Sequence, residues 1–220
     1  MSHANRNGVV IGTARLPGVL GCSGILVLAA LLRLWPIMSG PLVSHPDEVF
    51  LTLYPLNFLS GDLNPHSFHK PTFHFYLLGA LYGLYFSLQS AFTATGLTLS
   101  QFVAYHYFVD AAPILLLARL TSVTFAVATV WWGGRLASEV AGPRAGWIAA
   151  LLLAVGLLHV RQSPVAAVDV PMTLWVIGAV WAAARLLRRD RPHDYLLAAL
   201  LVGLAGATKY PAAAAWLAIP

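Results

Sequence analysis

The sequence predicts an all-α membrane protein, a polytopic bundle of about six to eight membrane helices with an outer loop that carries interfacial helices. Of its 220 residues, 59% are hydrophobic and only 10% are charged, whereas soluble domains carry about 25% charged residues. Uncharged apolar runs of 14 or more residues recur along the chain. This pattern excludes an ordinary cytosolic domain and a disordered chain, because neither tolerates so much apolar surface in water. We expect a single integral membrane domain over residues 1–220.

The net charge of +5 comes from 13 Lys and Arg residues that mostly separate the apolar runs. They therefore serve better as topology signals than as a nucleic-acid surface. The single cysteine, Cys22, excludes an intramolecular disulfide framework and a Cys-based zinc site.

The first expected membrane helix runs from Gly18 to about Met38. Arg6 and Arg15 precede it, as they would in a signal peptide, but the segment that begins at Arg33 offers no small-residue cleavage site. We therefore interpret this segment as a retained helix. A first outer loop over residues 39–71 follows.

The middle of the chain has two interpretations. Residues 72–92 are apolar and rich in aromatic side chains, so they either span the membrane or lie at its interface. Residues 94–112 include Gln101, His106 and Asp110, which would be costly in contact with lipid. We favour a hairpin over residues 72–110 that does not cross the membrane.

From Arg119 onward, charged residues separate apolar runs of 14 to 16 residues. Such runs are slightly short for a span of about 20 residues, and snorkelling side chains at their ends make up the difference. A cytoplasmic N-terminus then leaves eight Lys and Arg residues inside and five outside, as the positive-inside rule requires. The outer five are Arg33, Lys70, Arg119, Arg161 and Lys209.

The same topology places five of the eight carboxylates outside, namely Asp47, Glu48, Asp62, Asp110 and Asp169. Solvation alone does not demand this segregation, whereas an outward-facing functional site would. No nucleotide-binding, zinc-protease or serine-hydrolase motif is present in the sequence.

The first candidate site segment is Ser44-His45-Pro46-Asp47-Glu48. Adjacent carboxylates can act as a general base or bind a metal ion. The structural alternative is a helix start, with Ser44 as the N-cap and Pro46 in the first turn.

The second segment contains His66, His69, Lys70 and Pro71. With Pro71 opening a helix, Lys70 would lie at a helix N-terminus that attracts anions, which favours a phosphate site. A snorkelling lysine is the alternative, and metal binding by the histidines is the weaker hypothesis.

Two further segments place Asp169 before Pro171 and Lys209 before Pro211. Taken singly, Asp169 is explained by a helix dipole and Lys209 by a snorkelling anchor. Four expected outer helix starts, each marked by a proline and a charge, together favour one convergent polar site.

These segments resemble the C-type (GT-C) membrane glycosyltransferases, most closely the branch of protein O-mannosyltransferases and aminoarabinose transferases. The resemblance rests on Asp47-Glu48, Gly61 to Pro65, Phe68 to Thr72, Ala118 to Ser122, Gly142 to Gly146, Ser163 to Pro171 and Gly206 to Tyr210, in that order. It corresponds to the N-terminal half of the family, so we expect a fragment, a truncated gene product or one part of a split protein.

The resemblance implies transfer of a sugar from a polyprenyl-phosphate carrier to a protein, lipid or glycan acceptor on the non-cytoplasmic face. It implies that Asp47 is the base or a carboxylate that orients the acceptor, that Glu48 is its catalytic partner, and that Lys70 contacts the carrier phosphate. Asp169 corresponds to an acidic residue near the acceptor or metal, and Arg119, Lys209 and His45 are further candidate substrate-binding residues. His69 stands where the aminoarabinose branch has a metal-binding carboxylate, so His69 and Glu48 are the candidate ligands of a divalent metal ion.

The expected partners are the lipid-linked donor, the acceptor and membrane lipids, with no nucleic acid, and the expected location is the plasma membrane of a prokaryote. Two alternatives remain. In a transporter or channel subunit, Arg119 and Asp169 would line a substrate path. A non-catalytic assembly protein could also keep the same fold.

Overall fold

The computed structural model describes residues 19–39, 45–93, 96–189 and 191–218. No strand occurs within these residues, so the predicted all-α class is confirmed for the described chain. The helices are α1 (Val19–Ser39), α2 (Pro46–Leu53), α3 (Phe73–Phe92), α4 (Leu99–Phe108), α5 (Ala112–Ala141), α6 (Pro143–Val155), α7 (Leu157–Gln162), α8 (Asp169–Arg189) and α9 (Pro192–Thr208), with the 3-10 helices η1 (Tyr54–Ser60) and η2 (Tyr210–Ala218).

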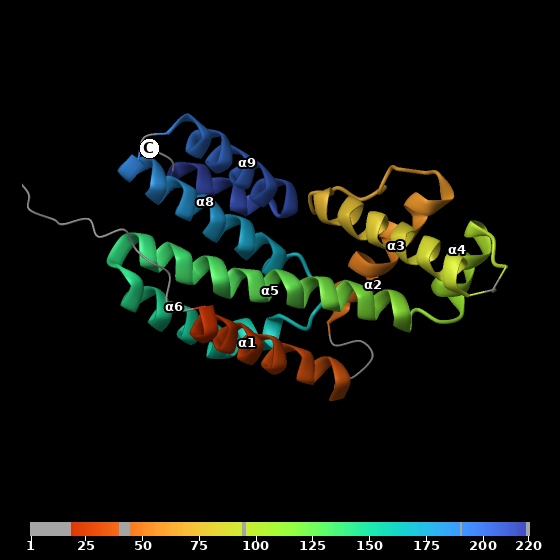
Figure 1. The fold of residues 1–220 in the computed structure, drawn as a ribbon. Coiled ribbons are helices and arrows are strands. Elements are labelled where there is room, and N and C mark those ends of the chain that lie inside the picture. The colour runs from red at the N-terminus through yellow and green to blue at the C-terminus, as the bar shows by residue number, and fades with distance from the viewer. Residues whose placement is uncertain (1–18, 40–44, 94–95, 190, 219–220) are drawn as a thin grey trace, which may run out of the picture.

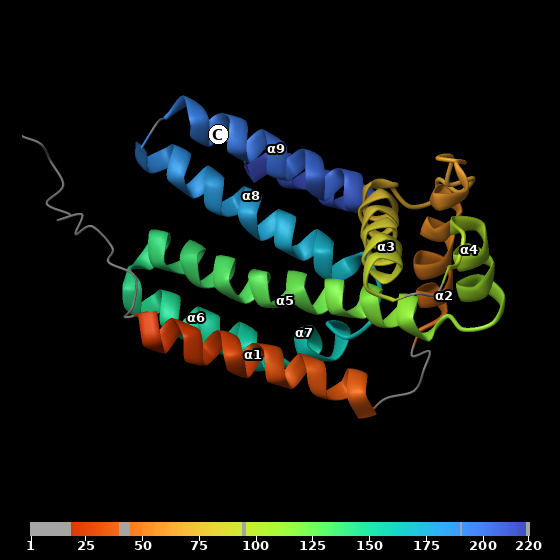
Figure 2. The same ribbon diagram turned by 45° about the vertical axis from the view of Figure 1, so that its right-hand side comes forward.

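The long helices α1, α5, α6, α8 and α9 lie side by side, and α2, α3 and α4 gather at one end of this bundle (Figures 1 and 2). In Figure 2 these three helices stand across the direction of α5. Helices α5, α6, α8 and α9 alternate in direction, so α5 and α8 begin at this end of the bundle, and α6 and α9 end toward it (Figure 1). Helix α1 also ends toward it. We call it the capped end.

Small residues allow close packing within the bundle. A side chain at Gly146 would come within 2.7 Å of the Gly134 carbonyl oxygen, so only glycine fits where α6 crosses α5. Ala29, Val130 and Ala154 form a buried cluster that joins α1, α5 and α6. Such contacts are expected in lipid, where close approach replaces the hydrophobic effect as the force between helices.

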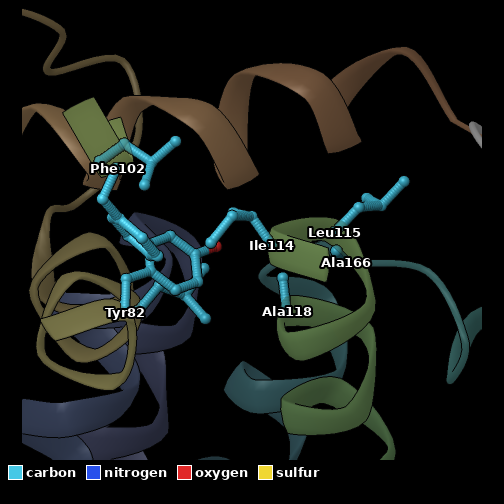
Figure 3. Close-up of a cluster of buried hydrophobic side chains, with 8 residues drawn as sticks. Tyr82, Phe102, Ile114, Leu115, Ala118 and Ala166 are labelled. Carbon is cyan, nitrogen blue, oxygen red and sulfur yellow. The ribbon is translucent and has the colours of Figure 1, made fainter. Parts of the chain in front are cut away.

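The capped end has its own core. Leu56, Tyr82, Phe102, Ile114 and Ala166 belong to one buried cluster, which joins η1, α3, α4, α5 and the segment before α8 (Figure 3). Gly79 and Gly83 of α3 lie against Phe58 and Leu59, so α3 packs closely on η1.

Among the residues that the structure describes, two helices are long and apolar enough to cross a membrane, Ala112–Ala141 and Asp169–Arg188. Shorter apolar helices cover Ser23–Met38 and Pro143–Val155. The predicted first helix corresponds to α1, with Arg6, Arg15 and Gly18 outside the described residues.

Two predicted helix starts are wrong. The charge at Arg119 was expected to precede a helix, but α5 begins at Ala112, so that Arg119 lies two turns inside it. Pro71 was expected to open a helix, but α3 begins at Phe73 with Thr72 as its N-cap. In both cases the charged residue belongs to a long-range ion pair, Arg119 with Glu48 and Lys70 with Asp47.

Candidate functional site

A buried cluster holds the predicted polar segments at the capped end. Leu51 of α2, Phe58 of η1, Phe75 of α3 and Val168 pack against one another. Asp47 lies one helical turn before Leu51, and Asp169 directly follows Val168. The starts of α2, α3 and α8 are therefore fixed to one another by apolar contact.

Asp47 pairs with Lys70 across the first loop. The Lys70 Nζ donates to Asp47 Oδ2 at 2.6 Å. The Asp47 side chain is 48% exposed and that of Lys70 only 18%. The hydrogen bond from Lys70 holds the pKa of Asp47 below its usual value. Because this pKa is depressed, the stabilisation is present above the ordinary value of about 4 and is lost as the pH falls through the depressed value.

Glu48, the next residue, has very different surroundings. Its side chain is fully buried. Arg119 donates two hydrogen bonds to it, from Nε to Oε1 and from Nη2 to Oε2, each at 2.9 Å. The Ala166 N–H also donates to Oε1 at 2.9 Å, and the His45 N–H to Oε2 at 3.3 Å. Four donors thus fill the lone pairs of the two oxygens. This leaves no free lone pair for the role of catalytic partner or metal ligand predicted for Glu48.

The start of α2 explains these different surroundings. His45 is the N-cap, and its Nδ1 accepts the Asp47 N–H at 3.1 Å. The cap predicted at Ser44 therefore falls on His45, and Ser44 itself lies outside the described residues. His45 has a structural role here. Asp47 and Glu48 both occupy the first turn, where the helix dipole favours negative charge.

A second lysine–carboxylate pair lies at the start of α8. Asp169 is the first residue of that helix. Its carboxylate accepts a hydrogen bond from the side chain of Lys209, the C-cap residue of α9. The neighbouring Tyr210 hydroxyl donates to the Phe68 carbonyl at 2.9 Å. This contact joins the Asp169–Lys209 pair to the loop that carries Lys70, so the structure brings the predicted loop and helix ends together.

The loop histidines do not form a metal cluster. His66 Nε2 lies 2.6 Å from Asp62 Oδ2, and this hydrogen bond lowers the pKa of Asp62. The exposed His69 pairs through Nδ1 with the Ser67 hydroxyl at 2.8 Å. The described residues contain no group of three or more His, Cys, Asp or Glu side chains placed to hold a metal ion. The predicted ligands His69 and Glu48 thus have separate partners.

Sequence reasoning missed the Glu48–Arg119 pair and the role of the Ala166 N–H. Arg119 stands in an apolar stretch of the sequence, and a charge buried in such surroundings pairs with another polar or charged group. That rule offered a signal for the ion pair. The donor at Ala166 is a backbone group, which carries no side-chain signal.

The fold and site define an all-helical, membrane-associated protein with three Lys– or Arg–carboxylate pairs at the capped end and a further pair, Arg185–Asp194, toward the opposite end. A family profile for dolichyl-phosphate-mannose-protein mannosyltransferases matches residues 108–219, just over half of the chain. The chain belongs to this family. The matched region includes Arg119, Asp169 and Lys209, whereas Asp47, Glu48 and Lys70 precede it. No curated protein and no solved structure matches the chain significantly.

The buried pair leads to a stability prediction. Glu48→Gln should lower the free energy of unfolding by about 3–5 kcal/mol, because it leaves the Arg119 charge buried without a countercharge. The double variant Glu48→Met/Arg119→Met should recover most of this loss. The measurement is equilibrium unfolding in detergent micelles.

Asp62→Asn, an exposed change in the same loop, is the matched control and should stay within about 0.5 kcal/mol of the parent. Unchanged stability in Glu48→Gln would contradict an anchoring role for the pair.

Proposed function

We propose that this chain takes part in the transfer of a sugar from a polyprenyl-phosphate-linked donor to an acceptor hydroxyl, on the non-cytoplasmic face of the membrane. Membership of the mannosyltransferase family supports the donor class. The observation that carries the site assignment is the Asp47–Lys70 contact of 2.6 Å. It joins a proton acceptor and a phosphate-binding cation at a partly exposed position.

In the proposed reaction, the bond between the anomeric carbon of the sugar and the carrier phosphate oxygen breaks. The bonding electrons leave with the phosphate, and Lys70 stabilises the charge that develops there. The acceptor hydroxyl oxygen forms the new glycosidic bond and gives its proton to Asp47. The products are the glycosylated acceptor and the carrier phosphate.

Lys70 must change partners in this scheme. When the carrier phosphate binds Lys70, the hydrogen bond that depresses the pKa of Asp47 is weakened. The pKa of Asp47 then rises toward its ordinary value, and Asp47 becomes a stronger base when the donor is present. Donor binding therefore prepares the carboxylate for its role.

The other site residues divide into two groups in this proposal. Asp169 and Lys209 form a second partly exposed pair, suited to binding the acceptor or the carrier phosphate. Glu48, Arg119 and His45 position the first turn of α2. The transporter alternative placed Arg119 and Asp169 along a substrate path, whereas both are paired with other side chains, and Arg119 is buried in its pair.

The arrangement of the helices supports a multi-pass topology. We propose that α1, α5, α6 with α7, α8 and α9 cross the membrane, and that α2, α3 and α4 lie at its outer interface. The steep crossing between α3 and α5 supports this division (Figure 2). The ends of α5 and α8 and the starts of α6 and α9 lie toward the opposite end of the bundle (Figure 1). The cations at these helix ends, which would face the cytoplasm, are Arg135, Arg144, Arg185, Arg188, Arg189 and Arg191.

The base assignment predicts a selective loss of turnover. Asp47→Asn keeps the side-chain shape and removes the proton acceptor, so kcat should fall about 100-fold or more while donor binding persists. The assay measures sugar transfer from a synthetic prenyl-phosphate sugar by the longest natural chain that contains this sequence.

Asp62→Asn is again the matched control and should retain normal turnover. Normal transfer by folded Asp47→Asn would leave Asp47 as a residue of a capped helix start. If the parent chain transfers no sugar, a non-catalytic assembly role becomes the better interpretation.

The phosphate assignment predicts a loss of donor affinity. Lys70→Met should weaken binding of a prenyl phosphate by about 1–3 kcal/mol, the scale of a charge-assisted hydrogen bond. It should also raise the pKa of Asp47, moving the acid limb of the kcat/KM profile to higher pH. Arg161→Met, an exposed change in α7, should do neither. Equal donor affinity in Lys70→Met and the parent would contradict the phosphate assignment and favour the alternative of a snorkelling lysine.

The topology predicts which positions face the outside. In a Cys22→Ser background, single cysteines at Asp62 and Gln162 should react with an impermeant thiol reagent in intact cells. Cysteines at Arg144 and Arg191 should react only after permeabilisation. Protection of residue 162 in intact cells would overturn the shared outer site.

A further inference from the structure

Arg33 is a fully buried cation on an otherwise apolar helix. It lies on α1, and all five of its N–H donors have acceptors. Nε donates to the Ser163 hydroxyl at 3.2 Å, and Nη1 to the carbonyls of Ala29 and Ala154, each at 2.9 Å. Nη2 donates to the Leu153 carbonyl at 3.0 Å and to His159 Nδ1 at 2.8 Å.

These partners are neutral groups, so no carboxylate balances the charge of Arg33 among them. Helix α6 ends at Val155, and Leu153 and Ala154 belong to its last turn, where carbonyls lack partners within the helix. The C-terminal end of a helix carries a partial negative charge. The end of α6 therefore serves as the counterion of Arg33, and Arg33 serves as its cap.

The Arg33 side chain also forms hydrogen bonds to the segment that leads to Asp169. Residues 156–168 connect α6 to α8, and Arg33 holds this connection through His159 and Ser163. Three residues after Ser163, the Ala166 N–H binds Glu48, and three residues later the chain reaches Asp169. The connection is thus held from α1 on one side and from α2 and α5 on the other.

We propose that Arg33 is a positioning residue, which clamps the 156–168 connection and so fixes both the Ala166 N–H against Glu48 and the position of Asp169. A direct role in binding a phosphate does not fit this geometry, because no donor of Arg33 remains free. The inferred effect on acceptor binding rests on the proposed function. The clamp itself does not.

The test measures hydrogen–deuterium exchange of the backbone by mass spectrometry, in the longest natural chain. Arg33→Met keeps much of the side-chain length and removes every donor. Exchange in residues 163–168 should become at least tenfold faster, while α5 stays protected. Arg33→Lys, with fewer donors, should show an intermediate effect, and Arg144→Met, an exposed arginine toward the opposite end, should show none.

Ser163→Ala removes a single acceptor from Arg33 and is the milder variant if Arg33→Met fails to fold. It should speed exchange in the same segment about threefold. Unchanged exchange over 163–168 in both Ser163→Ala and Arg33→Lys would overturn the clamp, as would an equal increase throughout the chain in these two folded variants.

A kinetic measurement separates positioning from general stability. If Asp169 binds the acceptor, Arg33→Lys should raise the KM for the acceptor at least threefold with little change in kcat, and Arg144→Met should change neither. A fall in the kcat of Arg33→Lys without a change in its KM for the acceptor would contradict the link from Arg33 to Asp169. If the parent transfers no sugar, the proposed function fails while the exchange experiment still decides whether Arg33 clamps the connection.

Discussion

The buried pair of Glu48 and Arg119 is the interaction on which the capped end depends. It joins α2 to α5 across 71 positions of the sequence, and the Ala166 N–H adds the segment before α8. Burying two charges is costly unless their hydrogen bonds are complete, and here the carboxylate has four donors. Successive helical residues point about 100° apart, so holding Glu48 inward directs Asp47 toward the surface and Lys70. The anchor therefore orients the residue beside it.

The apolar runs predicted most of the bundle correctly because helices in lipid must satisfy their backbone groups internally. The helices α1, α8 and α9 lie close to where the sequence places them. The start of α5 was missed because Arg119 looked like a boundary charge between apolar runs. Its partner Glu48 lies far away in the sequence, and local patterns carry no information about such a contact. The start of α3 shifted similarly, since Lys70 pairs with Asp47 instead of opening a helix.

For the site, the sequence predicted the residue types and their shared end of the molecule, but not their pairing. Asp47 and Lys70 were both candidates, and their direct contact depends on how the loop folds back on α2. Asp47 and Glu48 are adjacent residues with the same charged group, so the sequence does not tell their roles apart. The exposure of their side chains differs completely, because Glu48 is fully buried and Asp47 is half exposed. Arg33 was expected to be an outer flanking charge. Its capping of α6 requires a helix break after Val155 that only the folded chain reveals.

The strengths of the ion pairs indicate which of them can open during function. A partly exposed pair such as Asp47–Lys70 contributes about 0–1 kcal/mol, because solvent screens it and both partners regain hydration when it opens. Breaking a buried pair by removing one partner costs about 3–5 kcal/mol. In the proposed reaction, an incoming phosphate would therefore take Lys70 from Asp47 at little cost, but it could not take Arg119 from Glu48 without disrupting α2. Neighbouring carboxylates thus divide the work, with Glu48 holding the helix start in place and Asp47 left able to change partners.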